Sequence, residues 1–296
     1  MMRRSRATGP EWMVTYTPQE EWIEGKGKFL WLAFFFSEIG AGIYFVSLFM
    51  NFPTGWLVGW LVSLVLGGLT HAAYLGKATR GWRILLKPGS SELSRGLWVI
   101  LLYGVIGFFQ VVPIVIPGLP WTGDGGTLRT IMGIICILMI THGFLTMSVV
   151  RALPLWNSPM MIPLSLASGI LVGSQTVEWM IFLSGGNVGV AELWSRWSLL
   201  GYMGVLVIYL WSAFHASETA RVSLRRVLFG NVSVLFYLGV VAAGLIIPLI
   251  ITLNVWGGGA EKIGGGILLL RFMCVLIGDL VMRYEIMRSG LYTPLL

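Results

Sequence analysis

The chain has 296 residues, of which 56% are apolar and only 11% are charged. Soluble domains carry about 25% charged residues, so this composition excludes an ordinary soluble protein and indicates a protein integral to a membrane. The net charge of +7 is compatible with nucleic acid as a partner, but the placement of the basic residues along the chain explains it better as a membrane-topology signal. We therefore expect membrane lipid, and no nucleic acid, around this chain.

A polar N-terminal segment, residues 1–28, precedes the first apolar run. Within it, Thr17 suits a helix N-cap, Pro18 suits the first helical position and Glu20 completes a capping box. This spacing predicts a short helix at the membrane interface, with Trp22 on lipid or on a partner. A tail without regular structure is the alternative.

Eight apolar runs follow, and each reaches the roughly 20 residues that a helix needs to cross a bilayer. The runs cover residues 29–50, 56–76, 96–116, 128–150, 160–184, 198–217, 232–254 and 264–287. Because the connections are short, consecutive helices should be antiparallel neighbours in a compact bundle. The sequence therefore predicts an all-α integral membrane protein with eight transmembrane helices.

The second and sixth runs end in similar sequences. HAAYLGKATRGWR begins at His71 and HASETARVSLRR begins at His215, and in each a basic residue follows six positions after the histidine. Because these runs are four helices apart, the similarity indicates two four-helix bundles related as parallel repeats, over residues 29–151 and 152–296. A chance match between two short sequences is the alternative.

An even number of spans places both termini on one side of the membrane, which we call side A. Of the 20 Lys and Arg residues, sixteen lie on side A or at the helix ends near it. The four that lie toward the opposite side, side B, are Arg129, Arg196, Lys262 and Arg271. The positive-inside rule therefore predicts that side A, with both termini, is cytoplasmic.

Ionisable side chains inside a span cost at least about 2.5–3.5 kcal/mol each on insertion scales, so each one needs a reason. Five such groups lie in the half of the membrane near side A, on five different spans: Glu38, His71, His142, His215 and Asp279. Singly, each could be a satisfied core group, and Asp279 could pair with Arg283 one turn further on. Together they predict a polar pocket that opens toward side A.

Two more charged residues within the spans, Glu178 and Arg271, lie nearer side B. They are expected to pair with each other, because an unpaired charge in the membrane interior is costly. Together with His142 and Asp279 they could form part of a proton path. A purely structural ion pair is the alternative.

The sequence contains no motif of a serine hydrolase, a zinc protease or a phosphate-binding loop. Cys136 and Cys274 give neither a disulfide framework nor a cluster-binding pattern, and the three histidines lack metal-site spacing. No catalytic or metal-ligating residue is therefore expected. A pocket of His, Tyr, Glu and Arg with apolar walls suits a quinone, whose head group needs hydrogen-bond donors and groups that exchange protons. A haem b held by two histidines stays an alternative.

The stretch YLGKATRGWRILLKPGSSELSRG, which begins at Tyr74, resembles two related families. These are the polysulfide-reductase (NrfD-like) membrane subunits and the dimethyl-sulfoxide-reductase anchor subunits. Such proteins have eight spans, a loop HLGxPxRxW and then SSWxSRG opening the third helix, and residues 74–82 and 90–96 are similar to these motifs. The runs SEIGAGIYFVS and PLWNSPMMIPLSLASGILVG also look familial. The sequence departs from the motifs at Tyr74, Ala78 and Glu92, where the family has His, Pro and Trp.

The resemblance implies a quinone-reactive anchor subunit of a multisubunit oxidoreductase of anaerobic respiration, in a bacterial or archaeal cytoplasmic (inner) membrane. It implies an iron–sulfur (ferredoxin-like) partner subunit and a catalytic subunit, often a molybdopterin enzyme. Electrons would be exchanged with menaquinone or ubiquinone beneath the iron–sulfur subunit. Because such anchors carry no redox metal, no haem or iron–sulfur cluster is expected in this chain. A secondary transporter, which also has repeats and intramembrane charges, and a haem b cytochrome subunit are the alternatives.

The predicted quinone-binding residues are Glu38, His71, Tyr74, Arg80 and Arg95. His71 and Tyr74 are three residues apart, so they share one face of the helix end. Because the family's histidine is replaced at Tyr74, either His71 or the Tyr74 hydroxyl would supply the hydrogen bond. The predicted partner-docking residues are Lys77, Arg83 and Lys87.

Overall fold

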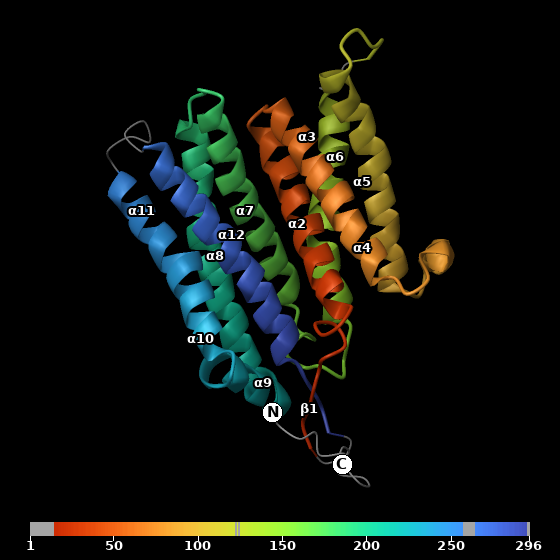
Figure 1. Ribbon diagram of the computed structural model, residues 1–296, viewed down its shortest axis with the longest axis vertical. Helices are drawn as coiled ribbons and strands as arrows, with labels where there is room; N and C mark the ends of the chain where they lie inside the picture. The colour runs from red at the N-terminus through yellow and green to blue at the C-terminus, as the bar shows by residue number, and fades with distance from the viewer. Residues whose placement is uncertain (1–14, 122, 124, 257–263, 295–296) are drawn as a thin grey trace.

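The computed structural model describes residues 15–121, 123, 125–256 and 264–294. This part of the chain is almost entirely helical (Figure 1). Within it, eight helices are long and apolar enough to cross a membrane. The predicted all-α integral membrane protein with eight spans is therefore confirmed.

Six of the spans are continuous α-helices, and two contain a π-helical segment. The continuous helices are α2 (Gly27–Phe49), α5 (Glu92–Val115), α6 (Gly126–Ser148), α7 (Met161–Leu183), α8 (Gly189–Ala216) and α12 (Gly265–Ser289). The second span consists of α3 (Pro53–Leu61), η1 (Val62–Gly67) and α4 (Gly68–Tyr74). The seventh consists of α10 (Ser233–Leu235), η3 (Phe236–Ile246) and α11 (Ile247–Val255). π-Helical turns are rare and are frequent at functional sites, and η1 lies one turn before His71.

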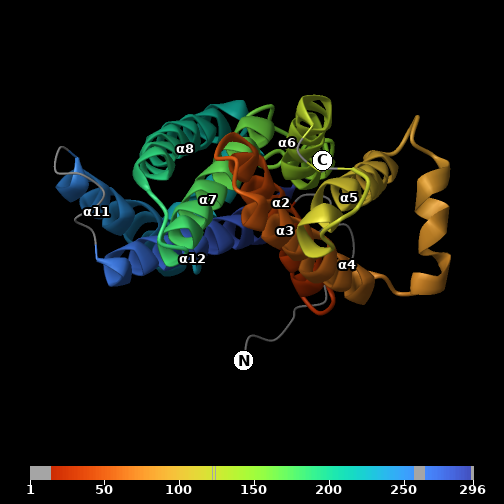
Figure 2. The same cartoon turned by 90° about the horizontal axis from the view of Figure 1, so that it is seen from above.

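α2 is the most buried span and lies between the two groups of helices (Figures 1 and 2). It packs against α3, α6 and α7. Small residues permit these contacts: a side chain on Gly42 would meet the backbone of Gly169, and one on Gly40 would meet Ser63. Helices in membranes associate largely through such close packing of small residues. The glycine-rich first span is therefore the helix around which the molecule is built.

The two ends of the described chain meet at side A. β1 (Thr17–Pro18) pairs antiparallel with β2 (Leu291–Tyr292), and the ring of Trp22 lies 5.2 Å from that of Trp156. The predicted interfacial helix starting at Thr17 is therefore wrong. The backbone at Thr17 is satisfied by strand pairing instead of a helical turn, and Trp22 packs on protein.

The sixth span, α8, begins at Gly189, nine residues earlier than the predicted start at residue 198. The charged residues in this extra stretch neutralise each other, because Arg196 donates to Glu192 at 2.7–3.1 Å. The Arg196 guanidinium also lies 4.7 Å from the Trp256 ring centroid. Because Glu192 and Arg196 pair with each other, the helix includes both residues, although their charges alone predicted that the span begins after them.

Figure 1 shows α2 to α6 gathered on one side of the molecule and α7 to α12, with the short helix α9 (Glu218–Phe229) among them, on the other. α2 packs against α7 between the two groups. The parallel-repeat relation between residues 29–151 and 152–296 stays a prediction. So does the cytoplasmic orientation of side A, and four residues of its charge count lie outside the described residues: Arg3, Arg4, Arg6 and Lys262.

Candidate functional site

A cavity of about 410 Å³ lies at side A between α2, α4, α5 and α6, and the 3-10 helix η2 (Ala78–Leu86) closes it from one side. Its polar lining consists of Ser37, Ser63, His71, Tyr74, His142 and Thr146, and the other lining residues are apolar or glycine. Two other hollows, of about 480 and 420 Å³, are lined without any ionisable side chain. The side-A cavity therefore combines apolar walls with convergent polar groups, as binding sites for small molecules do.

Two histidines lie near each other on the lining of this cavity, and the backbone holds them in a similar way. The Nδ1 atom of His71 lies 2.9 Å from the Gly67 carbonyl oxygen, and that of His142 lies 2.6 Å from the Met139 carbonyl oxygen. Because a carbonyl only accepts, each Nδ1 carries the proton, and each Nε2 of a neutral ring is an acceptor. The two ring centroids are 6.4 Å apart, and the Phe34 ring is 6.1 Å from both.

The Nε2 atom of His142 is buried and has no hydrogen-bond partner among the described residues. Buried polar atoms are nearly always hydrogen-bonded, so an unpartnered one calls for an explanation such as a bound ligand. The His142 side chain is therefore held by one nitrogen and keeps the other available. This is the arrangement expected of a ligand-binding imidazole.

Local sequence features place these rings. The Ser63 hydroxyl in η1 donates to the Ser37 carbonyl oxygen at 2.9 Å, which fixes the second span to α2 about two turns from His71. On the opposite wall, a Cβ atom on Gly96 would lie only 3.2 Å from Cδ2 of His142. The glycine that ends the Ser-Arg-Gly motif is therefore what lets α5 approach the histidine of α6.

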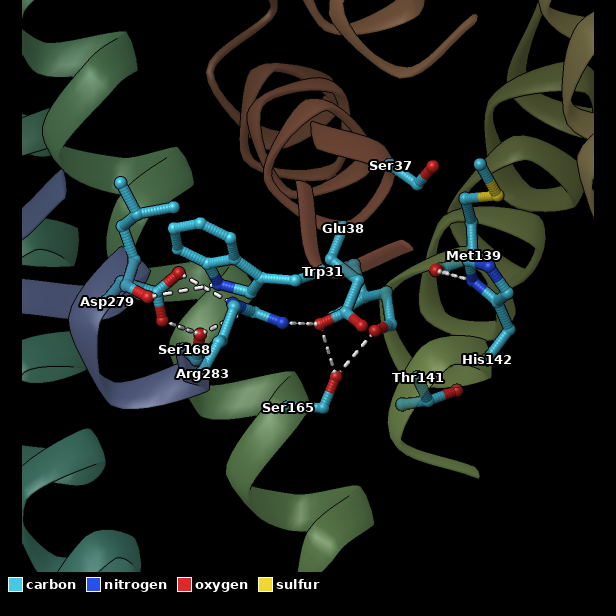
Figure 3. Close-up of polar contacts among 12 residues, drawn as sticks. Trp31, Ser37, Glu38, Met139, Thr141, His142, Ser165, Ser168, Asp279 and Arg283 are labelled. Atoms are coloured by element: carbon cyan, nitrogen blue, oxygen red, sulfur yellow. Dashed lines mark hydrogen bonds and ion pairs between the residues drawn. The ribbon is translucent and has the colours of Figure 1, made fainter. Parts of the chain in front are cut away.

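A second polar cluster lies between α2, α7 and α12, on the other side of Glu38 from His142 of α6 (Figure 3). The Arg283 guanidinium is buried and forms ion pairs with Glu38 and with Asp279, the latter at 2.8 Å. It also donates to the Ser168 hydroxyl at 2.6 Å, and the Ser165 hydroxyl donates to Glu38 Oε2 at 2.9 Å. The Asp279–Arg283 pair, which the sequence offered as the alternative to a pocket role for Asp279, is present.

This cluster contains two carboxyl groups and one guanidinium. Glu38 Oε1 is buried without a hydrogen-bond partner among the described residues. It lies against Gly143, because a Cβ atom there would collide with it, and Gly143 directly follows His142. Glu38 Oε1 therefore lies one residue along α6 from His142, and a Cβ atom on Gly143 would also touch the Phe34 ring, which lines the cavity.

The structure brings some predicted residues together and separates others. His71 and Tyr74 line the cavity, and His142 joins them. Glu38 and Arg80, both predicted to bind quinone, lie outside the cavity lining: Glu38 pairs with Arg283, and Arg80 is exposed on η2. Their role in quinone binding stays a prediction.

Two more predicted positions differ from expectation. Arg95 lies outside the cavity lining: it pairs with Glu92 and donates to the Pro88 carbonyl at 2.8 Å, so it braces the loop before α5. His215 is exposed beside Trp211 and Phe214. The single pocket formed from five ionisable groups is therefore replaced by two sites, and His215 belongs to neither.

The expected pair of Glu178 and Arg271 is confirmed, and both side chains are fully buried. Glu178 Oε1 and two nitrogens of Arg271 have no hydrogen-bond partner in the part of the chain that the structure describes. The pair lies on α7 and α12, the same helices that carry Ser168 and Asp279. Its participation in a proton path stays a prediction.

Sequence reasoning missed several contributors to the two sites. Phe34 and Trp82 give the cavity its apolar walls, and Ser165 and Ser168 complete the buried cluster. The serines share one face of α7 by their spacing of three, which was the available signal. For Phe34, only its position one turn before Glu38 on the same helix face connects it with the site.

Fold and site together define a polytopic helical membrane protein with an apolar, histidine-bearing pocket near one end of its bundle. The sequence is 30% identical over 155 residues to the C subunit of the polysulfide reductase of Wolinella succinogenes. The matched region covers 50% of this protein, which spans about half (48%) of the length of that relative. No family model matches the sequence. The resemblance seen in the sequence to polysulfide-reductase membrane subunits is thus confirmed by a curated relative.

Proposed function

We propose that this chain is the membrane anchor subunit of an oxidoreductase complex and that it exchanges electrons between an iron–sulfur partner subunit and the membrane quinone pool. The observation that carries the proposal is the side-A cavity, in which His71 and His142 each keep one ring nitrogen for a ligand. The name of the curated relative, a subunit of a polysulfide reductase, supports the oxidoreductase assignment. A catalytic subunit would complete the complex.

The residues of the cavity fit a quinone head group. His71 and His142 lie on two walls and would hydrogen-bond its oxygens, and the Tyr74 hydroxyl is a further donor at the rim. Phe34 and Trp82 offer flat apolar surfaces for the ring, and the exposed lining residues Leu93 and Leu101 suit an isoprenoid tail. Menaquinone and ubiquinone both meet these requirements. A bound quinone supplies two-electron chemistry that takes up or releases two protons.

The protein's own contribution is to hold the head group and to move its protons. A neutral His142 Nε2 accepts the proton of a quinol hydroxyl, and when protonated it donates to a quinone oxygen. Glu38 Oε1 lies next to Gly143 and is the nearest buried carboxyl oxygen without a partner that the site provides. We assign it the role of receiving protons from the cavity. The Glu178–Arg271 pair would extend such a path toward side B.

The direct test is purification of the tagged protein from its native membrane in mild detergent. The proposal expects an iron–sulfur protein in the preparation and a quinone in its organic-solvent extract. Recovery of the protein alone, without quinone, in a preparation that transports a solute would favour a secondary transporter instead. The fraction of the protein that carries quinone is the quantity to measure.

One observation favours haem b as a second candidate ligand of the same cavity. Two imidazoles bound to one metal ion at about 2.0–2.1 Å would have ring centres roughly 6 Å apart, and the His71 and His142 centroids are 6.4 Å apart. Both rings also donate Nδ1–H to a backbone carbonyl, as metal-binding histidines do. A visible absorption spectrum of the purified protein decides between the two ligands. A Soret band that disappears in His142→Ala would show that the cavity holds haem and not quinone.

A further inference from the structure

The helix that closes the cavity lies at the outer edge of the bundle. Figure 2 shows the segment between α4 and α5 set apart from the other helices, at the far side of the molecule from α11. Its polar ties to the bundle are at its C-terminal end, where Trp98 donates to the Leu85 carbonyl at 3.1 Å and Arg95 donates to the Pro88 carbonyl. η2 therefore packs on the bundle through one face, against α5 and the cavity, and no other span of the described chain covers its outer face.

The inner face of η2 lines the cavity, and its outer face is exposed. Gly81, Trp82, Ile84 and Leu85 line the cavity. Trp82 is nonetheless 59% exposed and Leu86 63% exposed. Apolar side chains this exposed at a helix end of a membrane protein indicate contact with the bilayer interface, where indole rings are enriched.

The exposed part of η2 and its flanks is strongly basic. Its cations are Lys77, Arg80, Arg83 and Lys87, and all four are exposed. In the described part of the chain none of them forms an ion pair, since the adjacent carboxylate of Glu92 is taken by Arg95. The Arg83 guanidinium lies 5.8 Å from the Trp82 ring centroid, so charge and indole occupy the same surface. Basic amphipathic helices of this kind bind anionic lipid surfaces.

We propose that η2 lies in the plane of the membrane interface, that its cations bind the phosphate groups of anionic phospholipids, and that this contact holds η2 closed over the cavity. The second half of the proposal rests on the proposed function, because it concerns access of the quinone. An anionic lipid suits this surface better than an acidic protein. The cations share it with Trp82 and Leu86, and the lipid-facing Leu69 and Leu93 continue it on α4 and α5. The sequence predicted instead that Lys77, Arg83 and Lys87 dock a partner subunit, and the experiments below distinguish that role from lipid binding.

The first experiment measures lipid retention by the full-length protein. Purified protein is placed in nanodiscs of phosphatidylcholine with phosphatidylglycerol, and bound phosphatidylglycerol is counted by native mass spectrometry. The test variant replaces three cations of η2 and its flanks: Lys77→Gln, Arg83→Gln and Lys87→Gln. The matched control replaces three exposed cations elsewhere on side A: Lys26→Gln, Arg151→Gln and Arg225→Gln.

Each cation near an anionic surface contributes about five-fold in affinity. The test variant should therefore bind phosphatidylglycerol at least ten-fold more weakly than the unmodified protein, and the control should bind it normally. Equal retention by all three proteins overturns the proposal. So does a test variant that keeps its lipid but no longer co-purifies with an acidic redox subunit that the control retains, because the cations then serve a protein.

The second experiment separates lipid binding from quinone access. The dissociation rate of a fluorescent quinone analogue is measured in nanodiscs with and without phosphatidylglycerol. We expect several-fold slower dissociation with the anionic lipid for the unmodified protein and the control, and no lipid effect for the test variant. Equal rates in both lipids would contradict the closing role of η2. No binding of the analogue in any lipid would reject the proposed function, while the lipid-retention result stands separately.

Discussion

Two adjacent sites differ in how far their buried polar groups are hydrogen-bonded: the cavity between α2, α4, α5 and α6, and the cluster around Arg283. In the cluster, the Arg283 guanidinium is fully engaged by Glu38, Asp279 and Ser168. In the cavity, each histidine makes one hydrogen bond to the backbone, and His142 Nε2 makes none among the described residues. The membrane penalises both kinds of polar group, so only the first arrangement stabilises the protein by itself.

The difference separates groups that hold the fold from groups that await a ligand. An ion cluster whose guanidinium is fully paired is costly to disturb, even though Glu38 Oε1 lacks a partner among the described residues, because removing one member strands the others in a low-dielectric interior. An unpartnered imidazole nitrogen is cheap to remove, since it contributes nothing until a ligand arrives. Variants of the cluster should therefore lose stability, and variants of the cavity should lose ligand binding.

The largest effect is expected at the cluster. Arg283→Leu leaves two buried carboxyl groups without their counter-charge, which should cost about 3–5 kcal/mol of stability. Thermal unfolding in detergent, followed by loss of monodisperse protein, measures this. The matched control is Arg288→Leu on the same helix, whose partly exposed pair with Glu24 should be worth about 0–1 kcal/mol. Similar melting temperatures for the two variants would show that the cluster does not support the fold.

A smaller stability effect with a large binding effect is expected at Gly96. Gly96→Val pushes Cβ and its methyl groups toward His142, and overpacking of this kind costs about 1–3 kcal/mol. Quinone-analogue binding should fall below detection while the protein remains folded. Gly104→Val on the same helix is the control, because a Cβ atom there meets only the flexible end of Leu64 at 3.5 Å. Undiminished binding by the Gly96 variant would show that the ligand does not contact this wall of the cavity.

Glu38→Gln tests both sites at once, because Glu38 pairs with Arg283 in the cluster and its Oε1 atom lies next to Gly143, the residue after His142. Arg283 keeps Asp279 as its counter-charge, so the stability loss should be only about 1–2 kcal/mol, the cost of one imperfect buried hydrogen bond. Proton uptake linked to quinone reduction should slow in a reconstituted complex, as followed with a pH-sensitive dye. Glu192→Gln, which disturbs the separate pair with Arg196, is the control. Normal proton uptake in the Glu38 variant would remove that carboxyl from the path.

The smallest effect is expected at the contact that positions η1. Ser63→Ala removes the hydrogen bond to the Ser37 carbonyl, which should cost about 1 kcal/mol. Because this contact fixes the span that carries His71, analogue binding should weaken by a few-fold as well. Ser198→Ala, on α8 at a hydroxyl that bonds only its own helix, is the control. A variant that is less stable but binds normally would separate the η1 contact from the site.

The sequence was sufficient for the spans and for pairs that are close along one helix, such as Asp279 and Arg283. Hydrophobic length and spacing carry that information directly. It was not sufficient for the rotation of a helix about its axis, which decides whether Glu38 faces the cavity or Arg283 and whether His215 faces the bundle or lipid. Rotation depends on packing between helices distant in sequence, such as Gly42 against Gly169, and an all-round apolar span does not reveal it.

The central claim is that the cavity lined by His71 and His142 binds a quinone. Its most direct test is the dissociation constant of a quinone analogue for the purified protein and for three alanine variants, at His71, His142 and His215. Loss of one hydrogen bond should weaken binding by about three- to ten-fold at His71 and at His142, with unchanged melting temperatures, and His215→Ala should bind as the unmodified protein does. Equal affinities for all four proteins would contradict the assignment of the cavity.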